Sequence, residues 1–363
     1  MECKYEAIVA GAGIWGCTVA RRLADAGKRV LVLEKRSVIG GNCACEIDAE
    51  TGIEIHTYGS HIFHTSNEDV WKFLNRFTSF NNYHHMVLAN YRGKIYHLPI
   101  GRTLYQEFGT DDKQAIFDAF IKGYTAKQWG MPAEKVDPAI IARLKVRDNF
   151  STDYFDDPYH GIPSEGYNKM FERMLEHENI EVRCGAGFGL STNCTDLHEL
   201  KDGGKIYYSG PIDALFDYKF GALPWRTLRF ELEKLGMADY QHNTVVNYTE
   251  YEVPYTRIHE FKHYHPEWMN SLNSCNSRTN KTIIMREYPK TWQLGDEPYY
   301  PIDNEESRAL VAKYQAEVEE FNHHNASCFM HHASCSLVVG GRLGGYKYYD
   351  MDKSVAAALE VEI

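Results

Sequence analysis

The chain has 363 residues, of which 44% are hydrophobic and 25% charged, and its formal net charge is −11. This composition is that of a globular protein with room for about two domains, and the acidic balance argues against a nucleic-acid-binding protein. No apolar segment reaches the ~18 residues of a membrane helix, and the N-terminus lacks a signal-peptide layout, so we expect a cytoplasmic protein without membrane insertion. The nine cysteines include no CxxC pair, which makes a disulfide framework unexpected.

The chain opens with a predicted βαβ unit, formed by a strand at Tyr5–Ala10, a helix to about Ala26 and a strand at Arg29–Glu34. Helical periodicity follows from about residue 103 to 143. Between roughly 221 and 300 the pattern predicts strands, at Val245–Tyr251, Thr256–His263 and Lys281–Tyr288. A strand at Ser336–Val339 and a helix from about Asp352 end the chain.

These elements predict an α/β fold in which a Rossmann-like dinucleotide-binding domain is interrupted by a helical insertion and an antiparallel β-sheet. The expected dinucleotide-binding domain comprises residues 1–85, 178–220 and 305–363. The helical domain is expected at 102–150, and the sheet domain at 86–101, 151–177 and 221–304.

The first turn carries the spacing that binds a dinucleotide. Gly11 permits the tight turn, Gly13 lets a diphosphate approach the backbone, and Gly16 allows the helix to pack closely on the strand. Glu34 ends the second strand, where a carboxylate accepts a hydrogen bond from a ribose hydroxyl. The unit is therefore predicted to bind a dinucleotide at the helix N-terminus.

Two features favour FAD over NAD as that dinucleotide. Directly after Glu34 come Lys35 and then Gly40-Gly41-Asn42, which resembles the extended fingerprint of FAD proteins of the glutathione-reductase and amine-oxidase type. A simple turn is the alternative for the glycine doublet. Near the C-terminus, Gly340-Gly341-Arg342 follows a strand and precedes a helix, an arrangement that can aim helix N–H groups at the pyrimidine edge of a flavin.

Longer motifs are spread through the chain: IHTYGSHIFH at 55–64, KGYTAKQWG at 122–130, VPYTR at 253–257, REYP at 286–289, DEPYYP at 296–301 and GGRLGGYKYYDM at 340–351. Together they resemble the UDP-galactopyranose mutase family, with matches from residue 5 to about 358. The resemblance implies an FAD-dependent isomerase that interconverts UDP-galactopyranose and UDP-galactofuranose. It further implies that N5 of reduced FAD is the nucleophile at the anomeric carbon, that UDP is the leaving group, and that NAD(P)H or another donor reduces the flavin.

The resemblance also assigns site residues. It implies catalytic roles for Arg143, Arg286, His64, Arg342 and Asp350. It implies substrate contacts from Phe120, Ile121, Tyr124, Trp129, Arg143, Tyr154, Arg257, Arg286, Tyr314 and Tyr348. The expected cofactor-binding residues are Gly11, Gly13, Gly16, Glu34, Lys35, Gly40, Gly41, Asn42, His61, His64, Arg342, Asp350 and Met351.

Within this set, Arg143 and Arg286 are expected to hold the diphosphate, since a guanidinium fork suits a departing phosphate. Tyr124 is expected to stack on the uracil, and the residues at about 130–147 to form a mobile substrate lid. The histidines are expected to position the flavin rather than to act as acid or base. Without the context of the motifs, we would interpret each arginine as a surface cation and each tyrosine as a core residue.

Three alternatives stay open: an FAD oxidase or desaturase of the amine-oxidase type, a mutase for another nucleotide sugar, and a nucleotide-sugar-binding protein that has lost activity. The segment between Phe108 and Tyr124 is shorter than is usual in the family, and because that stretch commonly helps dimerisation, the expected homodimer is left open. The Cys/His-rich stretch His323–Cys335 suggests zinc by composition, but its spacing fits no usual ligand pattern, so no metal is predicted.

Overall fold

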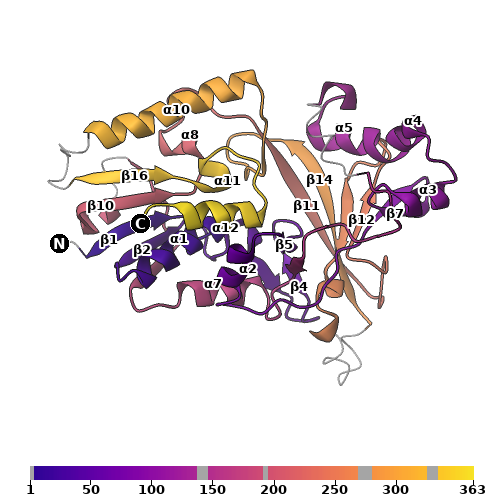
Figure 1. Cartoon of the computed structure of the whole chain (residues 1–363), viewed down its shortest axis with the longest axis horizontal. Coiled ribbons are helices and arrows are strands. Elements are labelled where there is room, and N and C mark those ends of the chain that lie inside the picture. The colour runs from indigo at the N-terminus through magenta and orange to yellow at the C-terminus, as the bar shows by residue number, and fades with distance from the viewer. Residues whose placement is uncertain (1–3, 137–145, 191–194, 269–279, 325–333) are drawn as a thin grey trace.

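The computed structural model describes residues 4–136, 146–190, 195–268, 280–324 and 334–363. Two sheets divide the molecule: a parallel sheet on the left of Figure 1 and a larger, mixed sheet on the right. The helices α3, α4 and α5 lie beyond the larger sheet, at the upper right of the same view. The described residues hold no helix that is long and apolar enough to cross a membrane.

The parallel sheet has the strand order of a doubly wound dinucleotide fold. Its order is β16–β10–β1–β2–β9, and every pairing is parallel. The strands span β1 (Tyr5–Ala10), β2 (Val30–Glu34), β9 (Ile180–Cys184), β10 (Leu200–Tyr208) and β16 (Cys335–Val339). All of β2 is buried, as expected for a strand with helices on both faces.

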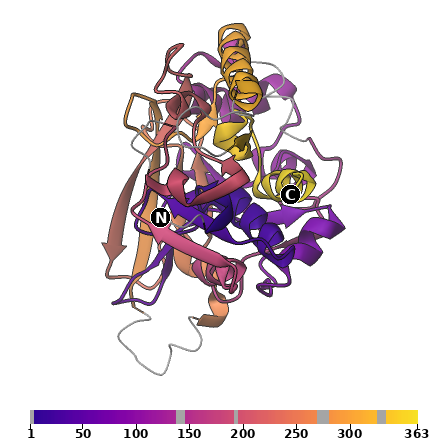
Figure 2. The ribbon, with the colours of Figure 1, turned by 90° about the vertical axis from the view of Figure 1, so that its left-hand side faces the viewer.

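Helices cover both faces of this sheet. They are α1 (Ile14–Asp25), α2 (Glu68–Leu74), α7 (Tyr167–Leu175), α8 (Ile212–Leu215), α10 (Glu305–His324), α11 (Gly341–Gly344) and α12 (Met351–Glu360). In Figure 2 the yellow α12, beside the C mark, lies next to the indigo α1, and the two helices are in contact. The end of the chain therefore returns to its first helix.

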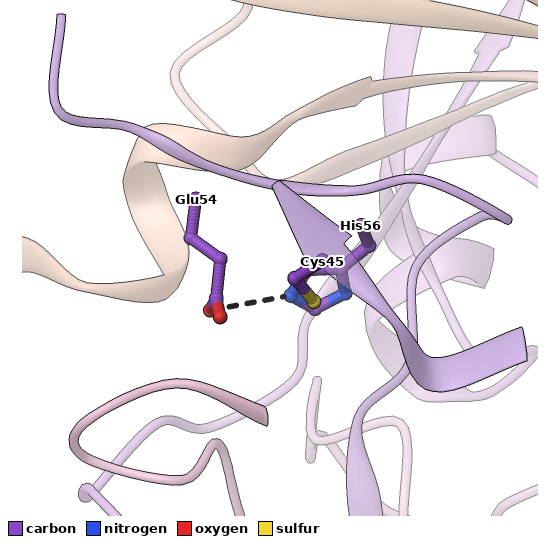
Figure 3. Close-up of side chains that lie close together, drawn as sticks. All are labelled: Cys45, Glu54 and His56. Atoms are coloured by element: carbon purple, nitrogen blue, oxygen red, sulfur yellow. Dashed lines mark ion pairs between the residues drawn. The ribbon is translucent and has the colours of Figure 1, made fainter. Parts of the chain in front are cut away.

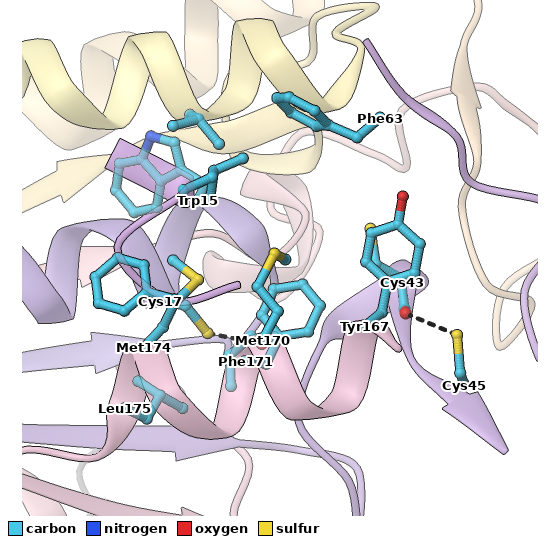
Figure 4. Packing of buried hydrophobic residues seen from close by; sticks show 14 of the residues in the cluster. Trp15, Cys17, Cys43, Cys45, Phe63, Tyr167, Met170, Phe171, Met174 and Leu175 are labelled. Atoms are coloured by element: carbon cyan, nitrogen blue, oxygen red, sulfur yellow. Dashed lines mark hydrogen bonds between the residues drawn. The ribbon is translucent and has the colours of Figure 1, made fainter. Parts of the chain in front are cut away.

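The main core lies between α1, α7 and the parallel sheet (Figure 4). The helix α7 buries Tyr167, Met170, Phe171, Met174 and Leu175, the spacing of one face of an amphipathic helix. Residues of the larger sheet also join this cluster, so the two halves share one continuous core.

The larger sheet has the order β15–β11–β14–β13–β12–β6–β7. Its strands span β6 (Val87–Tyr91), β7 (Lys94–Leu98), β11 (Trp225–Leu235), β12 (Val245–Tyr248), β13 (Arg257–Glu260), β14 (Thr282–Thr291) and β15 (Tyr300–Pro301). All its pairings are antiparallel except that of β12 with β6, which is parallel. The sheet that was predicted as antiparallel is therefore mixed, because β6, which comes from an earlier part of the chain, pairs in parallel with β12.

The helical insertion contains α3 (Arg102–Phe108), α4 (Lys113–Ile116), a π-helical stretch at Phe117–Lys122, α5 (Gly123–Trp129) and a 3₁₀ turn at Ala133–Lys135. Asp112 caps α4, since its side chain accepts a hydrogen bond from the Ala115 N–H at 2.8 Å. The insertion packs its aromatic residues against β6 and β7.

The α/β fold with a Rossmann-like sheet is confirmed. Residues 151–177, expected in the sheet domain, contact both halves of the molecule, and Asp153 bridges to Met86 just before β6. Their strand β8 (Tyr159–Gly161) pairs with β5 (Phe63–Thr65), and α7 packs against α1. A second small ribbon pairs β3 (Cys45–Ile47) with β4 (Glu54–His56). Local periodicity does not reveal these tertiary partners.

Candidate active site

Two glycine segments pack against each other at the N-terminus of α1. Gly11 has a φ of +104°, and a Cβ on Gly16 would lie 1.9 Å from the Gly11 carbonyl oxygen. A Cβ on Gly41 (φ +57°) would lie 2.8 Å from Gly13 Cα. A Cβ on Gly13 itself would meet no atom closer than 3.7 Å, so the backbone there faces open space. That space is where a dinucleotide diphosphate lies in this fold.

A cavity of about 440 Å³ extends from these glycines. Its lining includes ten of the expected cofactor residues: Gly11, Gly13, Glu34, Lys35, Gly40, Gly41, Asn42, His61, Arg342 and Met351. The Glu34 carboxylate accepts hydrogen bonds from the main-chain N–H groups of Ala12 (2.8 Å) and Arg36 (2.9 Å). These bonds hold the loop after β1 and the loop after β2 at the end of β2. Each carboxylate oxygen keeps a second lone pair for a ribose hydroxyl.

Arg36 supplies unused donors to this cavity. Its Nη2 donates to Glu297 and to Asn42, each at 2.9 Å, and its guanidinium lies 4.0 Å from the centre of the Tyr58 ring. Its Nε and Nη1 atoms are buried and have no hydrogen-bond partner among the described residues. Buried donors without partners are costly, so an anionic ligand fits this end of the cavity.

His61 and Arg342 line another part of the same cavity. His61 Nδ1 donates to the Gly59 carbonyl at 2.7 Å, which leaves Nε2 as an acceptor. Burial, aided by His56 and Arg342, lowers the pKa of His61 to about 3, so the ring is neutral. Arg342 donates to the carbonyls of Tyr349 (2.8 Å) and Tyr299 (3.3 Å), and its charge is available to an electron-rich ring.

Beside Arg342 lies a second polar group, here called the Arg257 cluster: Tyr124, Tyr154, Arg257, Glu287 and Tyr300. Arg257 Nη2 donates to the Tyr124 hydroxyl at 2.5 Å, and Arg257 Nε lies 3.2 Å from Glu287 Oε1. Tyr300 links this cluster to the cavity. Its ring stacks on that of Tyr348, with 5.6 Å between the ring centres, and the centre of the Tyr348 ring lies 5.7 Å from the Arg342 guanidinium.

The charge states of Glu287 and Tyr300 in the Arg257 cluster follow from the shifts of their pKa values. Burial raises the pKa of Glu287, but Arg257 and His259 more than offset it and hold the value at about 2, so Glu287 is a carboxylate. Burial and Glu287 raise the pKa of Tyr300, against the opposing effects of Arg257 and Arg342. Tyr300 is therefore a neutral hydroxyl within the influence of two arginines.

Comparison with known proteins identifies the family. The profile described as UDP-galactopyranose mutase matches residues 119–348, and that of an NAD(P)-binding Rossmann-like domain matches residues 9–77. The chain belongs to the UDP-galactopyranose mutase family.

Similar curated proteins match along the whole chain. A dTDP-fucopyranose mutase from Escherichia coli is 33% identical, over 97% of this chain and 96% of its own length. A probable UDP-galactopyranose mutase from Klebsiella pneumoniae is 34% identical, over 97% and 92%. A solved structure, "reduced UDP-Galactopyranose mutase", has a TM-score of 0.67 at 14% identity, over 98% of this chain and 93% of the other. Both curated relatives are mutases, which favours an isomerase over the oxidase alternative.

Tyr314 is placed away from both the cavity and the Arg257 cluster. It lies on α10, is fully buried, and packs against Phe220 at 5.2 Å between ring centres. Its hydroxyl donates to the Gly221 carbonyl at 2.7 Å and accepts from the Phe220 N–H at 3.1 Å. Because the hydroxyl already has both hydrogen bonds inside the core, the structure favours a packing role for Tyr314 over its expected contact with a diphosphate.

Arg286 also points elsewhere. Side chains alternate along a strand, so Arg286 and Glu287 lie on opposite faces of the larger sheet. Arg286 Nη1 donates to Glu233 on β11 at 2.7 Å, whereas Glu287 faces Arg257. The structure therefore favours Arg257 over Arg286 as the arginine that this sheet presents beside the cavity, and the diphosphate-binding role expected of Arg286 stays a prediction.

Phe120 and Ile121 belong to the core of the helical insertion. Phe120 is buried against Phe108 (5.0 Å between ring centres) and Tyr96 (5.2 Å), and Ile121 packs on the same cluster. The structure therefore favours packing roles for both residues over the expected substrate contacts. Arg143 lies outside the described residues, as do half of the expected lid and most of the Cys/His-rich stretch.

The other expected residues lie around the site without a direct place in the cavity lining. His64 Nδ1 lies 2.8 Å from Asp157, and its ring stacks on Phe155 at 3.7 Å. Asp350 is the exposed N-cap residue of α12, just before the cavity-lining Met351. Trp129 ends α5 half-buried. Roles for these residues stay predictions.

Sequence reasoning missed Arg36, Glu287 and Tyr300 as site residues. Each stands beside or within a segment already singled out: Arg36 follows Lys35, Glu287 lies in REYP, and Tyr300 in DEPYYP. The alternation of a strand could have suggested that only one of Arg286 and Glu287 faces the site, but the choice of face needs the neighbouring strands.

A buried group of Cys45, Glu54 and His56 has the residue types of a metal site (Figure 3). The His61 main-chain N–H, however, donates to His56 Nδ1 at 3.0 Å, so neutral His56 carries its proton on Nε2 and offers no lone pair there. Glu54 instead accepts from His265 Nε2 at 2.9 Å and lies 3.8 Å from His56 Nε2. The group is a buried carboxylate that accepts a hydrogen bond from His265 and lies beside His56.

Proposed function

We propose that this chain is a flavin-dependent mutase that interconverts UDP-galactopyranose and UDP-galactofuranose. The observation that carries the proposal is the Arg257 cluster, which offers a second cationic site directly beside Arg342. An oxidase needs no such site, whereas a diphosphate leaving group does. The cytoplasmic location and the homodimer that the sequence predicts are also proposals.

FAD fits the cavity described above. The open backbone at Gly13 and the free donors of Arg36 would hold its diphosphate, and Glu34 a ribose hydroxyl. His61 and Arg342 would position the ring system, with the arginine favouring an anionic reduced flavin. When bound and reduced, FAD would supply N5 as the nucleophile at the anomeric carbon.

The chain's own residues would hold the substrate and stabilise the leaving group. Arg257, held by Glu287, would neutralise charge on the departing UDP, and Tyr300 and Tyr348 would donate hydrogen bonds to the same oxygens. The Tyr124 ring would stack on the uracil, and Tyr154 and Trp129 would border the sugar. Arg143 is retained as a second diphosphate ligand on the strength of the sequence motifs.

The identity of the sugar nucleotide is the finer question. The two curated relatives differ by a single percentage point in identity, although one is a dTDP-fucopyranose mutase and the other a probable UDP-galactopyranose mutase. A mutase acting on dTDP-fucose is therefore the second candidate.

The test is a turnover assay with purified protein of known FAD content. Dithionite-reduced protein should convert UDP-galactofuranose to UDP-galactopyranose, and oxidised protein should not. Parallel incubation with dTDP-fucofuranose decides between the two sugars by the ratio of kcat/KM. Oxygen consumption with amines and no mutase turnover would contradict the proposal and support an oxidase.

A further inference from the structure

A hydrogen-bonded chain of Ser60, His259 and Glu287 runs beneath the proposed substrate site. Ser60 Oγ lies 2.6 Å from His259 Nδ1, and His259 Nε2 lies 3.2 Å from Glu287 Oε2. The other Glu287 oxygen faces Arg257 at 3.2 Å. The chain therefore joins the loop that carries His61 to the Arg257 cluster.

The direction of these hydrogen bonds follows from the chemistry of each group. Glu287 is ionised and can only accept, so His259 Nε2 carries a proton and its N–H donates a hydrogen bond to the carboxylate. His259 Nδ1 then has a free lone pair, and the Ser60 hydroxyl must be the donor. A hydroxyl, an imidazole base and a carboxylate that orients the base are the components of an activated hydroxyl.

Burial places the accessible end of the chain at Ser60. His259 is fully buried and Glu287 nearly so, whereas Ser60 is half-buried and directly precedes the cavity-lining His61. Charged or titratable groups facing His259 are Glu287 from β14, Arg257 on its own strand, His56 from β4, and His61 and His85 from neighbouring loops. Burial, together with Arg257 and His56, lowers the pKa of His259 despite Glu287, so its ring is a neutral base.

We propose that Ser60 and His259 form a proton relay for the sugar hydroxyl that closes the furanose ring, with Ser60 in contact with substrate and His259 acting through it. This inference rests on the proposed function. As that hydroxyl bonds to the anomeric carbon, its proton passes to Ser60 Oγ while the Ser60 proton passes to His259 Nδ1. The imidazolium is paired with Glu287. The oxygen that leaves the pyranose ring takes one proton from solvent when that ring opens, and the imidazolium releases one proton to solvent after the furanose ring closes. A turnover therefore has no net proton change and needs no oxidant or reductant.

The kinetic test compares Ser60→Ala and His259→Gln with His97→Gln, whose exposed histidine pairs with Glu107 far from the site. Flavin content is measured first, and kcat/KM of the reduced proteins is then followed against pH. The parent should lose activity as the pH falls and His259 becomes protonated. Both relay variants should keep flavin, lose ~10²–10⁴-fold in rate and lose this acidic limb, while the control keeps it. Thr at position 60 should recover part of the rate, since it retains a hydroxyl.

A spectroscopic test does not depend on turnover. Heteronuclear NMR of histidine-labelled protein, with the His259 resonances assigned by their absence in His259→Gln, should show the neutral Nε2–H tautomer and a change at Nδ1 in Ser60→Ala. A parent without activity on any nucleotide sugar would sink the proposed function but leave this measurement intact. The relay is overturned by an Nδ1–H tautomer, by parental rates and an unchanged acidic limb in both flavin-loaded variants, or by loss of flavin in both.

Discussion

Arg257 and Arg286 stand on adjacent strands, β13 and β14, but project from opposite faces of the same sheet. In the register of these strands Arg257 is opposite Glu287, and Ile258 is opposite Arg286. Alternation along a strand then sends the two guanidinium groups in opposite directions. One meets Tyr124 beside the cavity, and the other meets Glu233 on the outer face.

This relationship predicts unequal effects of the same substitution. Arg257→Ala should bind FAD and lower turnover by ~10²–10³-fold, as expected for loss of a charged donor to a leaving group. Arg286→Ala should stay within a few-fold of the parent. Arg257→Lys should recover part of the rate, because an ammonium lacks the planar fork. The measurement is kcat of the reduced variants, and equal losses at both positions would contradict the assignment.

Tyr124 is predicted to contribute through both its ring and its hydroxyl. Tyr124→Ala should weaken UDP binding by ~1–3 kcal/mol if the ring stacks on the base. Tyr124→Phe keeps the ring but removes the acceptor of the 2.5 Å hydrogen bond from Arg257, so it should affect turnover more than affinity. Isothermal titration with UDP separates the two, and unchanged affinity in the alanine variant would show that the ring is only packing.

Tyr314 should behave as a core residue. Tyr314→Phe leaves the Gly221 carbonyl and the Phe220 N–H without their partner, which should cost about 1–2 kcal/mol of unfolding free energy. KM and kcat should not change. Denaturant unfolding and steady-state kinetics on the same preparation check both expectations. A raised KM with parental stability would support the substrate contact that the sequence predicted for Tyr314.

Gly13→Val should fold and lose flavin. The added side chain has room within the protein, since the nearest atom to its Cβ is 3.7 Å away, but it occupies the space left for a diphosphate. Absorbance after purification gives the flavin content, and circular dichroism the fold. Gly236→Val, at an exposed position where an added Cβ meets no atom within 4 Å and the backbone φ is not positive, controls for a generic effect of replacing glycine by valine. Full FAD occupancy in Gly13→Val would contradict the placement of the diphosphate.

Stability should depend on pH through His85. Burial, with Arg257 and His64, lowers the pKa of His85 from 6.5 to about 3. A depressed histidine pKa means that the unfolded chain binds the proton first, so this contribution is present above pH 6.5 and is lost as the pH falls toward 3. His85→Gln should reduce the loss of unfolding free energy between about pH 7 and about pH 5 by ~1–2 kcal/mol. Urea unfolding at both pH values checks this, and an unchanged difference would mean that His85 does not titrate as stated.

Individual helices and strands could be predicted from the sequence because they depend mainly on residues that are close along the chain. The strand at Tyr5–Ala10 and the helix after it follow from periodicity and from the glycine turn, and the structure has them at those positions. Glu34 likewise lies at the end of β2, where the offset from the glycines predicts it. The long motifs identified the family because they are contiguous residues of the chain.

Only the tertiary structure decided which of those residues face one another. Arg286 and Glu287 are neighbours in one motif, yet the pairing of β14 with β13 and β11 sends only Glu287 toward the site. Tyr300 and Tyr314 are both tyrosines of the C-terminal part of the chain, but β15 brings Tyr300 to Tyr348, whereas the packing of α10 buries Tyr314. Ser60 and His259 are 199 residues apart and touch because the loop at Ser60 packs against strand β13 of the larger sheet. A sequence by itself sets the period of each strand and helix, whereas the face that each residue presents depends on register and packing between segments distant along the chain.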